Sequence, residues 1–184
     1  MQKKNQFTTR VIVYSALFAA LAAVLGQLLA IRPTPDMKFT LDKFVLFLSG
    51  LFFGPFVGGM TGLVADFAGG YLFGLGFTPQ LCLPAVLYGV AGGIFRHFLA
   101  KKFNIFRLAV AYLCPTAIAA VLIQSAALAW TFNPATFMAS FLLNLTTRSV
   151  QFSIMLVVEV AIIYFLIKSK LFNRVGIWPP VKKK

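Results

Sequence analysis

The segment Gly54–Gly76 reads GPFVGGMTGLVADFAGGYLFGLG, and Asp66 is its single charged residue. A bilayer span needs about 20 predominantly apolar residues, which this segment supplies. An ionised carboxylate within a bilayer costs at least about 2.5–3.5 kcal/mol unless it faces a protein interior or a polar ligand. Because the chain has only four acidic residues, Asp66 is the first candidate for a functional residue.

The composition of the whole chain supports a membrane location. Of 184 residues, 60% are hydrophobic and 11% are charged, and the mean hydropathy is +0.88. A water-soluble fold of this size cannot bury that much apolar surface. The first apolar run ends in IRPTP without a small-residue cleavage pattern, so we expect it to remain as a membrane span and not to be a removable signal peptide.

Apolar run lengths predict an all-α integral membrane protein with a single domain over residues 1–184. The second run is short for a bilayer, and Gly54-Pro55 separates it from the third with almost no loop. This predicts a tight turn or two partly broken helices. The six predicted spans are 10–31, 41–54, 56–74, 81–99, 106–130 and 137–167.

The basic residues predict the orientation. With six spans, both termini, the 54–55 turn and the 96–107 loop share one side, which collects 13 of the 17 lysine and arginine residues. An excess of these residues marks the cytoplasmic side, so both termini are predicted to be cytoplasmic. The net charge of +13 then reflects topology and contact with anionic lipids. No nucleic-acid-reading motif accompanies it, and no nucleic-acid partner is expected.

Arg148 is the second charged residue that is predicted to lie within a membrane span. Helix rise places Asp66 about 10 Å and Arg148 about 16 Å below the outer surface, so both are accessible from outside. They either pair with each other and pin two helices, or bind a ligand that inserts between them. Glu159 lies about 16 Å further toward the cytoplasm. We expect it to serve helix packing, to be protonated or to contact a cytoplasmic partner, and not to bind the ligand.

Three predicted outer loops are rich in aromatic and hydrogen-bonding groups. Residues 32–41, RPTPDMKFTL, are predicted to form an ordered lid because prolines fix φ. The other two loops are GLGFTPQL at 74–81 and WTFNPATF at 130–137. Together they suit a flat, polar heteroaromatic ligand. A membrane-interface aromatic belt accounts equally well for Trp130 taken alone.

Small residues form stripes on two predicted helices. Ala16, Ala20 and Ala23 share one face of the first span, and Gly58 and Gly62 continue at i+4 to Asp66 on the third. Such stripes let helix backbones approach closely. Internal packing explains the glycines, whereas the alanine face either packs internally or docks a partner membrane protein.

Catalytic motifs are missing from the sequence. It contains no Walker-type loop, no HExxH and no plausible Ser/His arrangement, and its one histidine, His97, lies in the basic 96–107 loop. Cys82 and Cys114 lack paired metal-ligand spacing and are expected in the core. We therefore predict that the protein is not an enzyme and has no ATPase of its own, no metal and no cofactor.

The chain resembles the substrate-binding (S) components of energy-coupling factor (ECF) vitamin transporters, and most closely the folate-specific branch. The resemblance rests on the six spans with basic cytoplasmic ends and on three blocks: SALFAALAA (15–23), LFLSGLFFGPFVGGMTGLVADFAGGYLF (46–73), and LLNLTTRSV (142–150) with Arg148. It implies a multi-pass protein of the prokaryotic plasma membrane that captures a vitamin outside the cell. A transmembrane coupling protein and two ATPase subunits would then drive its release inward. Ala16 and Ala20 would form the docking face.

Folate suits the predicted residues. The Asp66 carboxylate would accept parallel hydrogen bonds from N3–H and the 2-amino group of the pterin, and Arg148 would meet the pterin carbonyl or ring nitrogens. Stacking would come from Tyr71, Phe73, Phe77 and Trp130. The glutamate tail would be attracted by Arg32, Lys38 and Lys43 at the mouth of the site. The alternatives are another vitamin, such as pantothenate or a queuosine precursor, and, from a different class, a membrane enzyme or a channel.

Overall fold

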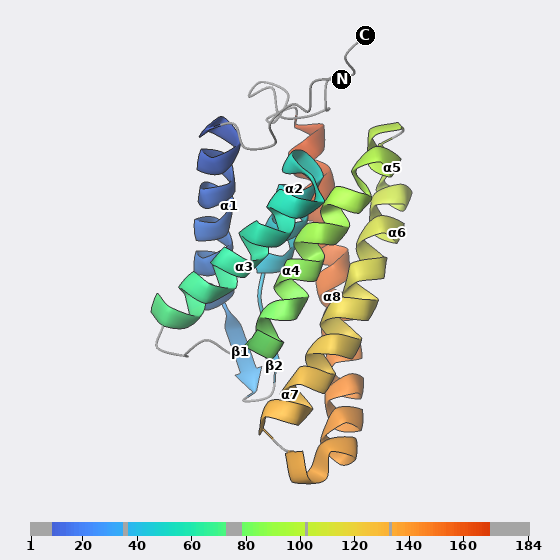
Figure 1. The fold of residues 1–184 in the computed structure, drawn as a ribbon. Coiled ribbons are helices and arrows are strands. Elements are labelled where there is room, and N and C mark those ends of the chain that lie inside the picture. Colours follow the sequence, from blue (N-terminus) through green and yellow to red (C-terminus); the bar gives the residue numbers. More distant parts are fainter. Residues whose placement is uncertain (1–8, 35–36, 73–78, 102, 133, 170–184) are drawn as a thin grey trace.

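The computed structural model describes residues 9–34, 37–72, 79–101, 103–132 and 134–169 (Figure 1). The first half of the chain contains α1 (Thr9–Gln27), β1 (Ile31–Thr34), β2 (Met37–Phe39), α2 (Asp42–Phe53), α3 (Pro55–Leu72) and α4 (Pro79–Ile94). The second half contains α5 (Arg96–Lys101), α6 (Ile105–Pro115), the π-helix η1 (Thr116–Ile123), α7 (Gln124–Phe132), the 3-10 turn η2 (Pro134–Thr136) and α8 (Phe137–Lys168).

The predicted all-α fold is correct except for one β-hairpin. β1 and β2 pair antiparallel, with Ile31 opposite Phe39 and Thr34 opposite Met37. The hairpin falls within the segment that was predicted to be an ordered lid. Pro33 is compatible with it because the fixed φ of proline is tolerated in an edge strand, where no amide proton is needed.

Among the residues that the structure describes, three helices are long and apolar enough to cross a membrane: Thr9–Gln27, Ile105–Thr131 and Phe137–Lys168. The second of these is a continuous rod built from α6, η1 and α7. Its switch from α to π geometry comes directly after Pro115, where the missing amide proton and the ring disturb the regular hydrogen-bond ladder. The predicted span 81–99 covers two helices, because α4 ends at Ile94 and a separate short helix, α5, follows.

Figure 1 shows which elements share each end of the bundle. The start of α1, the turn between α2 and α3, α5 and the end of α8 lie at one end. The hairpin, the end of α3, the start of α4 and the connection between α7 and α8 lie toward the other end. The chain therefore runs back and forth along the bundle axis.

Helix α2 is enclosed by the rest of the bundle. Every residue from Phe44 to Phe52 is buried, and α2 packs against α1, α3 and α4 and contacts α8. Its first residue, Asp42, follows the hairpin closely. The hairpin thus leads the chain into the interior, so that the charged residues at the start of α2 lie inside the protein.

Glycines let α2, α3 and α4 touch through their backbones. Gly54 connects α2 to α3 with a φ of +100°, a conformation that favours glycine. A Cβ atom added to Gly58 would lie 2.4 Å from the carbonyl oxygen of Gly89 and 2.5 Å from the Cα of Gly50. This confirms that the glycine stripe of the third predicted span serves internal packing.

Candidate functional site

An ion pair at the start of α2 forms the centre of the candidate site. Lys43 Nζ lies 2.6 Å from Asp42 Oδ2, and the side chains are 13% and 14% exposed. Lys43, which was predicted to attract the glutamate tail, is therefore largely enclosed by the protein. The physical reason is the hairpin, which places the beginning of α2 inside the protein. There Lys43 partly offsets the cost of burying nearby carboxylates.

Asp66 joins this charged group from α3. Its carboxylate interacts electrostatically with Lys43, Asp42 and Lys38 and is hydrogen-bonded with the thiol of Cys82 on α4. Asp66 is only partly buried. The carboxylate therefore lies within a charged environment and is not isolated among apolar side chains.

Lys38 ties the hairpin to the first and last helices. Its Nζ donates a hydrogen bond to Gln27 Oε1 of α1 at 3.0 Å, and its backbone carbonyl accepts one from Gln151 Nε2 of α8 at 2.5 Å. Strand β2 is thereby fixed between two helices that are far apart in the sequence. Like Lys43, Lys38 is engaged with the interior of the protein.

Arg148 and Asp66 do not form an ion pair. Among the described residues, the salt bridge between Lys43 and Asp42 is the only one, and Nε of Arg148 is buried without a hydrogen-bond partner. The alternative in which Asp66 and Arg148 serve only to pin two helices together is therefore not supported. Arg148 retains hydrogen-bonding capacity inside the bundle.

Glu159 lies one level deeper on α8 and is connected to the same charged group. It is 1% exposed, and its Oε2 accepts a hydrogen bond from the hydroxyl of Tyr112 at 2.8 Å. It also interacts electrostatically with Asp42 and Lys43. Counting along α8 alone separated Glu159 from the outer residues, but the depth of the α2 N-terminus brings Asp42 and Lys43 close to it.

Tyr71 and Trp130, the predicted aromatic site residues that the structure describes, are both exposed. Tyr71 is 64% exposed and packs on Phe67, with ring centroids 4.7 Å apart. Trp130 is 66% exposed and meets Phe137 edge-on at 6.1 Å. Phe73 and Phe77 lie outside the described residues, as does the side chain of Arg32.

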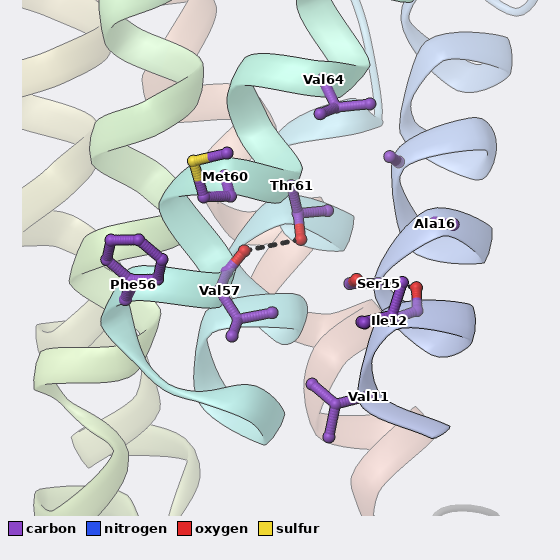
Figure 2. Close-up of a pocket in the computed structure, with 10 residues that line it drawn as sticks. Val11, Ile12, Ser15, Ala16, Phe56, Val57, Met60, Thr61 and Val64 are labelled. Carbon is purple, nitrogen blue, oxygen red and sulfur yellow. Dashed lines mark hydrogen bonds between the residues drawn. The ribbon is translucent and has the colours of Figure 1, made fainter. Parts of the chain in front are cut away.

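A separate groove of about 500 Å³ lies between α1 and α3 (Figure 2). Its lining is almost entirely apolar and includes Ala16, and its Thr61 hydroxyl is satisfied within α3 by the carbonyl of Val57 at 2.8 Å. Ala20, one turn further along α1, is exposed. The groove is therefore distinct from the charged interior.

Several residues of the charged interior were not predicted from the sequence. Gln27, Gln151 and Asp42 were given no role there. Cys82 is buried as expected, but its contact with Asp66 was not foreseen, and Cys114 is exposed and not in the core. The position of Gln151, three residues after Arg148 on one helix face, was the available signal.

Within the described part of the chain, no group of three His, Cys, Asp or Glu side chains is arranged to hold a metal ion.

The fold is a helical bundle whose interior holds polar and charged side chains beneath a hairpin. Comparisons with known proteins identify the family of membrane proteins that has this fold. Residues 10–173 match the family model of the ECF transporter substrate-specific component. The chain belongs to this family, which confirms the family predicted from the sequence.

Curated relatives include UPF0397 proteins of Streptococcus pneumoniae. One from serotype 19F is 28% identical over 101 residues, which is 55% of this chain and 56% of the relative. Another, from strain CGSP14, is 29% identical over 94 residues, 51% of this chain and 52% of the relative. The chain thus spans about half the length of the curated relatives that it matches.

Two solved structures share the fold. A crystal structure of FolT bound with folic acid superposes with a TM-score of 0.72 at 26% identity, covering 87% of this chain and 93% of that one. The S-component for biotin from an ECF-type ABC transporter gives a TM-score of 0.60 at 18% identity, covering 91% and 95%. The second likeness concerns the fold alone.

Proposed function

We propose that this protein is the vitamin-binding subunit of an ECF-type importer and that its vitamin is folate. The observation that carries the proposal is a partly exposed carboxylate, Asp66, which interacts electrostatically with the largely enclosed Lys43 in a fold similar to FolT. The proposed subunit captures folate from outside the cell and has neither catalytic nor ATPase activity of its own.

The proposed ligand matches the chemistry of the interior. One carboxylate oxygen of Asp42 pairs with Lys43, one of Glu159 accepts from Tyr112, and the second oxygen of each is buried. Asp66 is the carboxylate left most open to a ligand, and it accepts hydrogen bonds from the donor edge of the pterin. Arg148, whose Nε has no partner among the described residues, donates to the pterin carbonyl.

The proposed topology has six spans in one domain of the plasma membrane, with both termini cytoplasmic. Support comes from the bundle end that holds the start of α1, the α2–α3 turn, α5 and the end of α8 (Figure 1). Arg10, Arg96, Arg107 and Lys168 belong to these elements or to the first turn of α6. An excess of basic residues marks a cytoplasmic end.

The proposed partners are a transmembrane coupling protein and two ATPase subunits, and the docking face is the α1 surface with Ala16 and Ala20. Small side chains on an exposed helix face let another membrane helix approach closely, and the adjoining groove accepts larger apolar side chains. An Ala16→Leu variant should bind folate normally but lose ATP-driven uptake in vesicles that contain the coupling module. Ala139→Leu, at an exposed alanine of α8, should leave both unchanged.

The central test is folate titration of the purified protein in detergent. Asp66→Asn, which preserves size but removes the charge, should lose most of the folate affinity while the protein still elutes as a folded species. Near-normal binding by this variant would contradict the assignment. A vitamin panel including pantothenate, biotin and a queuosine precursor, together with the mass of any copurifying small molecule, identifies the ligand if folate does not bind.

A further inference from the structure

The side-chain amide of Gln151 on α8 has a fixed orientation. Gln151 is 2% exposed, and its Nε2 donates to the backbone carbonyl of Lys38 at 2.5 Å. A carbonyl oxygen accepts hydrogen bonds and cannot donate them. The amide therefore cannot turn over without losing its bond to the hairpin, and Oε1 is held on the other side.

The Oε1 atom of Gln151 is buried and has no hydrogen-bond partner among the described residues. An unsatisfied buried acceptor costs about 1–3 kcal/mol. Nε of Arg148, three residues earlier, is a buried donor that likewise has no partner there. Residues three apart share a helix face, with Cβ atoms about 5–6 Å apart. Helix α8 thus offers an acceptor and a donor from neighbouring side chains.

An acceptor beside a donor is complementary to a lactam edge, in which an N–H group stands next to a carbonyl group. The pterin of folate has such an edge in N3–H and its 4-carbonyl. We propose that Gln151 is a specificity-determining residue, whose Oε1 accepts a hydrogen bond from N3–H while Arg148 donates to the 4-carbonyl. The inference rests on the proposed folate-binding function and refines it, since Asp66 then receives the 2-amino group.

The test compares the affinities of folate and aminopterin, the analogue with a 4-amino group in place of the carbonyl and no hydrogen on N3. Aminopterin exchanges donor and acceptor along the edge, so the wild-type protein should bind folate at least roughly tenfold more tightly. In Gln151→Met the preference should fall to about threefold or less. Ser153→Ala, at an exposed position on the same helix, should keep the wild-type ratio.

The ratio of the two affinities separates recognition from structural support. Gln151→Met also loses the bond to Lys38, and a loosened hairpin weakens both ligands in the same proportion. A variant that binds both ligands more weakly at an unchanged ratio overturns the inference and leaves the proposed function standing. A water molecule on Oε1 in place of ligand would give the same unchanged ratio. Wild-type protein that binds neither ligand overturns the proposed function and this inference with it.

A second variant covers the case in which Gln151→Met does not fold. Gln151→Glu retains an acceptor oxygen at the same distance from the backbone, and its protonated carboxyl group donates to the Lys38 carbonyl, so it should keep a folate preference of roughly tenfold. A folded Gln151→Glu protein that binds both ligands equally contradicts the assignment of the acceptor role.

Discussion

Two regions of the bundle differ in how their contacts are made. One is the contact among α2, α3 and α4, and the other is the inner face of α8. In the first region glycines bring backbones into direct contact, and the space between helices is too small for a side chain. In the second, Arg148 and Gln151 keep buried polar atoms without partners among the described residues. The comparison distinguishes a tightly packed scaffold from a helix face that keeps unused hydrogen-bonding capacity, which we propose that a ligand uses.

The largest expected effect is on the scaffold. Gly58→Ala should destabilise the protein by about 3 kcal/mol, because the new methyl group meets backbone atoms that cannot move aside. Its Cβ would lie 2.4 Å from the carbonyl oxygen of Gly89. Thermal unfolding in detergent measures the change.

A second glycine of α3 provides the matched control. The nearest atom to a Cβ on Gly69 is Cγ of Gln27 at 3.6 Å, an ordinary van der Waals contact. Gly69→Ala should therefore be neutral or slightly stabilising, since alanine favours helix by up to about 1 kcal/mol. Equal losses at the two positions would show that backbone contact is not what distinguishes them.

An intermediate effect is expected on α8. Arg148→Met should leave the unfolding temperature unchanged or raise it, because it removes a buried cation that forms no ion pair. Folate affinity should fall roughly tenfold or more, as expected for the loss of a charged hydrogen bond. A clear drop in thermal stability would show that Arg148 supports the fold, and it would weaken the distinction between the glycine contacts and the inner face of α8. Titration and unfolding on the same preparation give both values.

The smallest effect of a side-chain replacement is expected for Glu159→Gln. Glu159→Gln keeps an oxygen that accepts the Tyr112 hydroxyl, so the stability should change by less than about 1 kcal/mol and folate affinity should stay the same. Glu159→Leu leaves that hydroxyl unpaired and should cost about 1–3 kcal/mol. A folate affinity that changes tenfold in Glu159→Gln would extend the ligand-binding surface down α8.

Features that depend on the residues of a single segment could be predicted from the sequence. The cost of a carboxylate in an apolar run singled out Asp66, and the i+4 spacing of Gly58 and Gly62 indicated close helix contact. The family followed from such local blocks. Segment lengths also located most helices, although a turn in the backbone ended α4 earlier than hydropathy suggested.

The remaining features depend on contacts between distant segments, and no local pattern reveals them. Lys43 was placed at the surface because residues 32–41 have the prolines and charges of a loop, yet the hairpin carries the following residues inward. Gln151 was overlooked because its partner, the carbonyl of Lys38, lies 113 residues away. The pairing of Asp66 with Cys82 likewise requires knowledge of how α3 meets α4.

The bond between Gln151 and Lys38 also has a consequence for biogenesis. The ribosome releases α8 after the hairpin and after α2, α3 and α4, so the hairpin lacks its anchor on that side until α8 has been made. The glycine-mediated contacts of α2, α3 and α4 involve segments close together in the chain and can form earlier in the membrane. A nascent chain is therefore expected to acquire its scaffold first and its affinity for ligand only once α8 has been made.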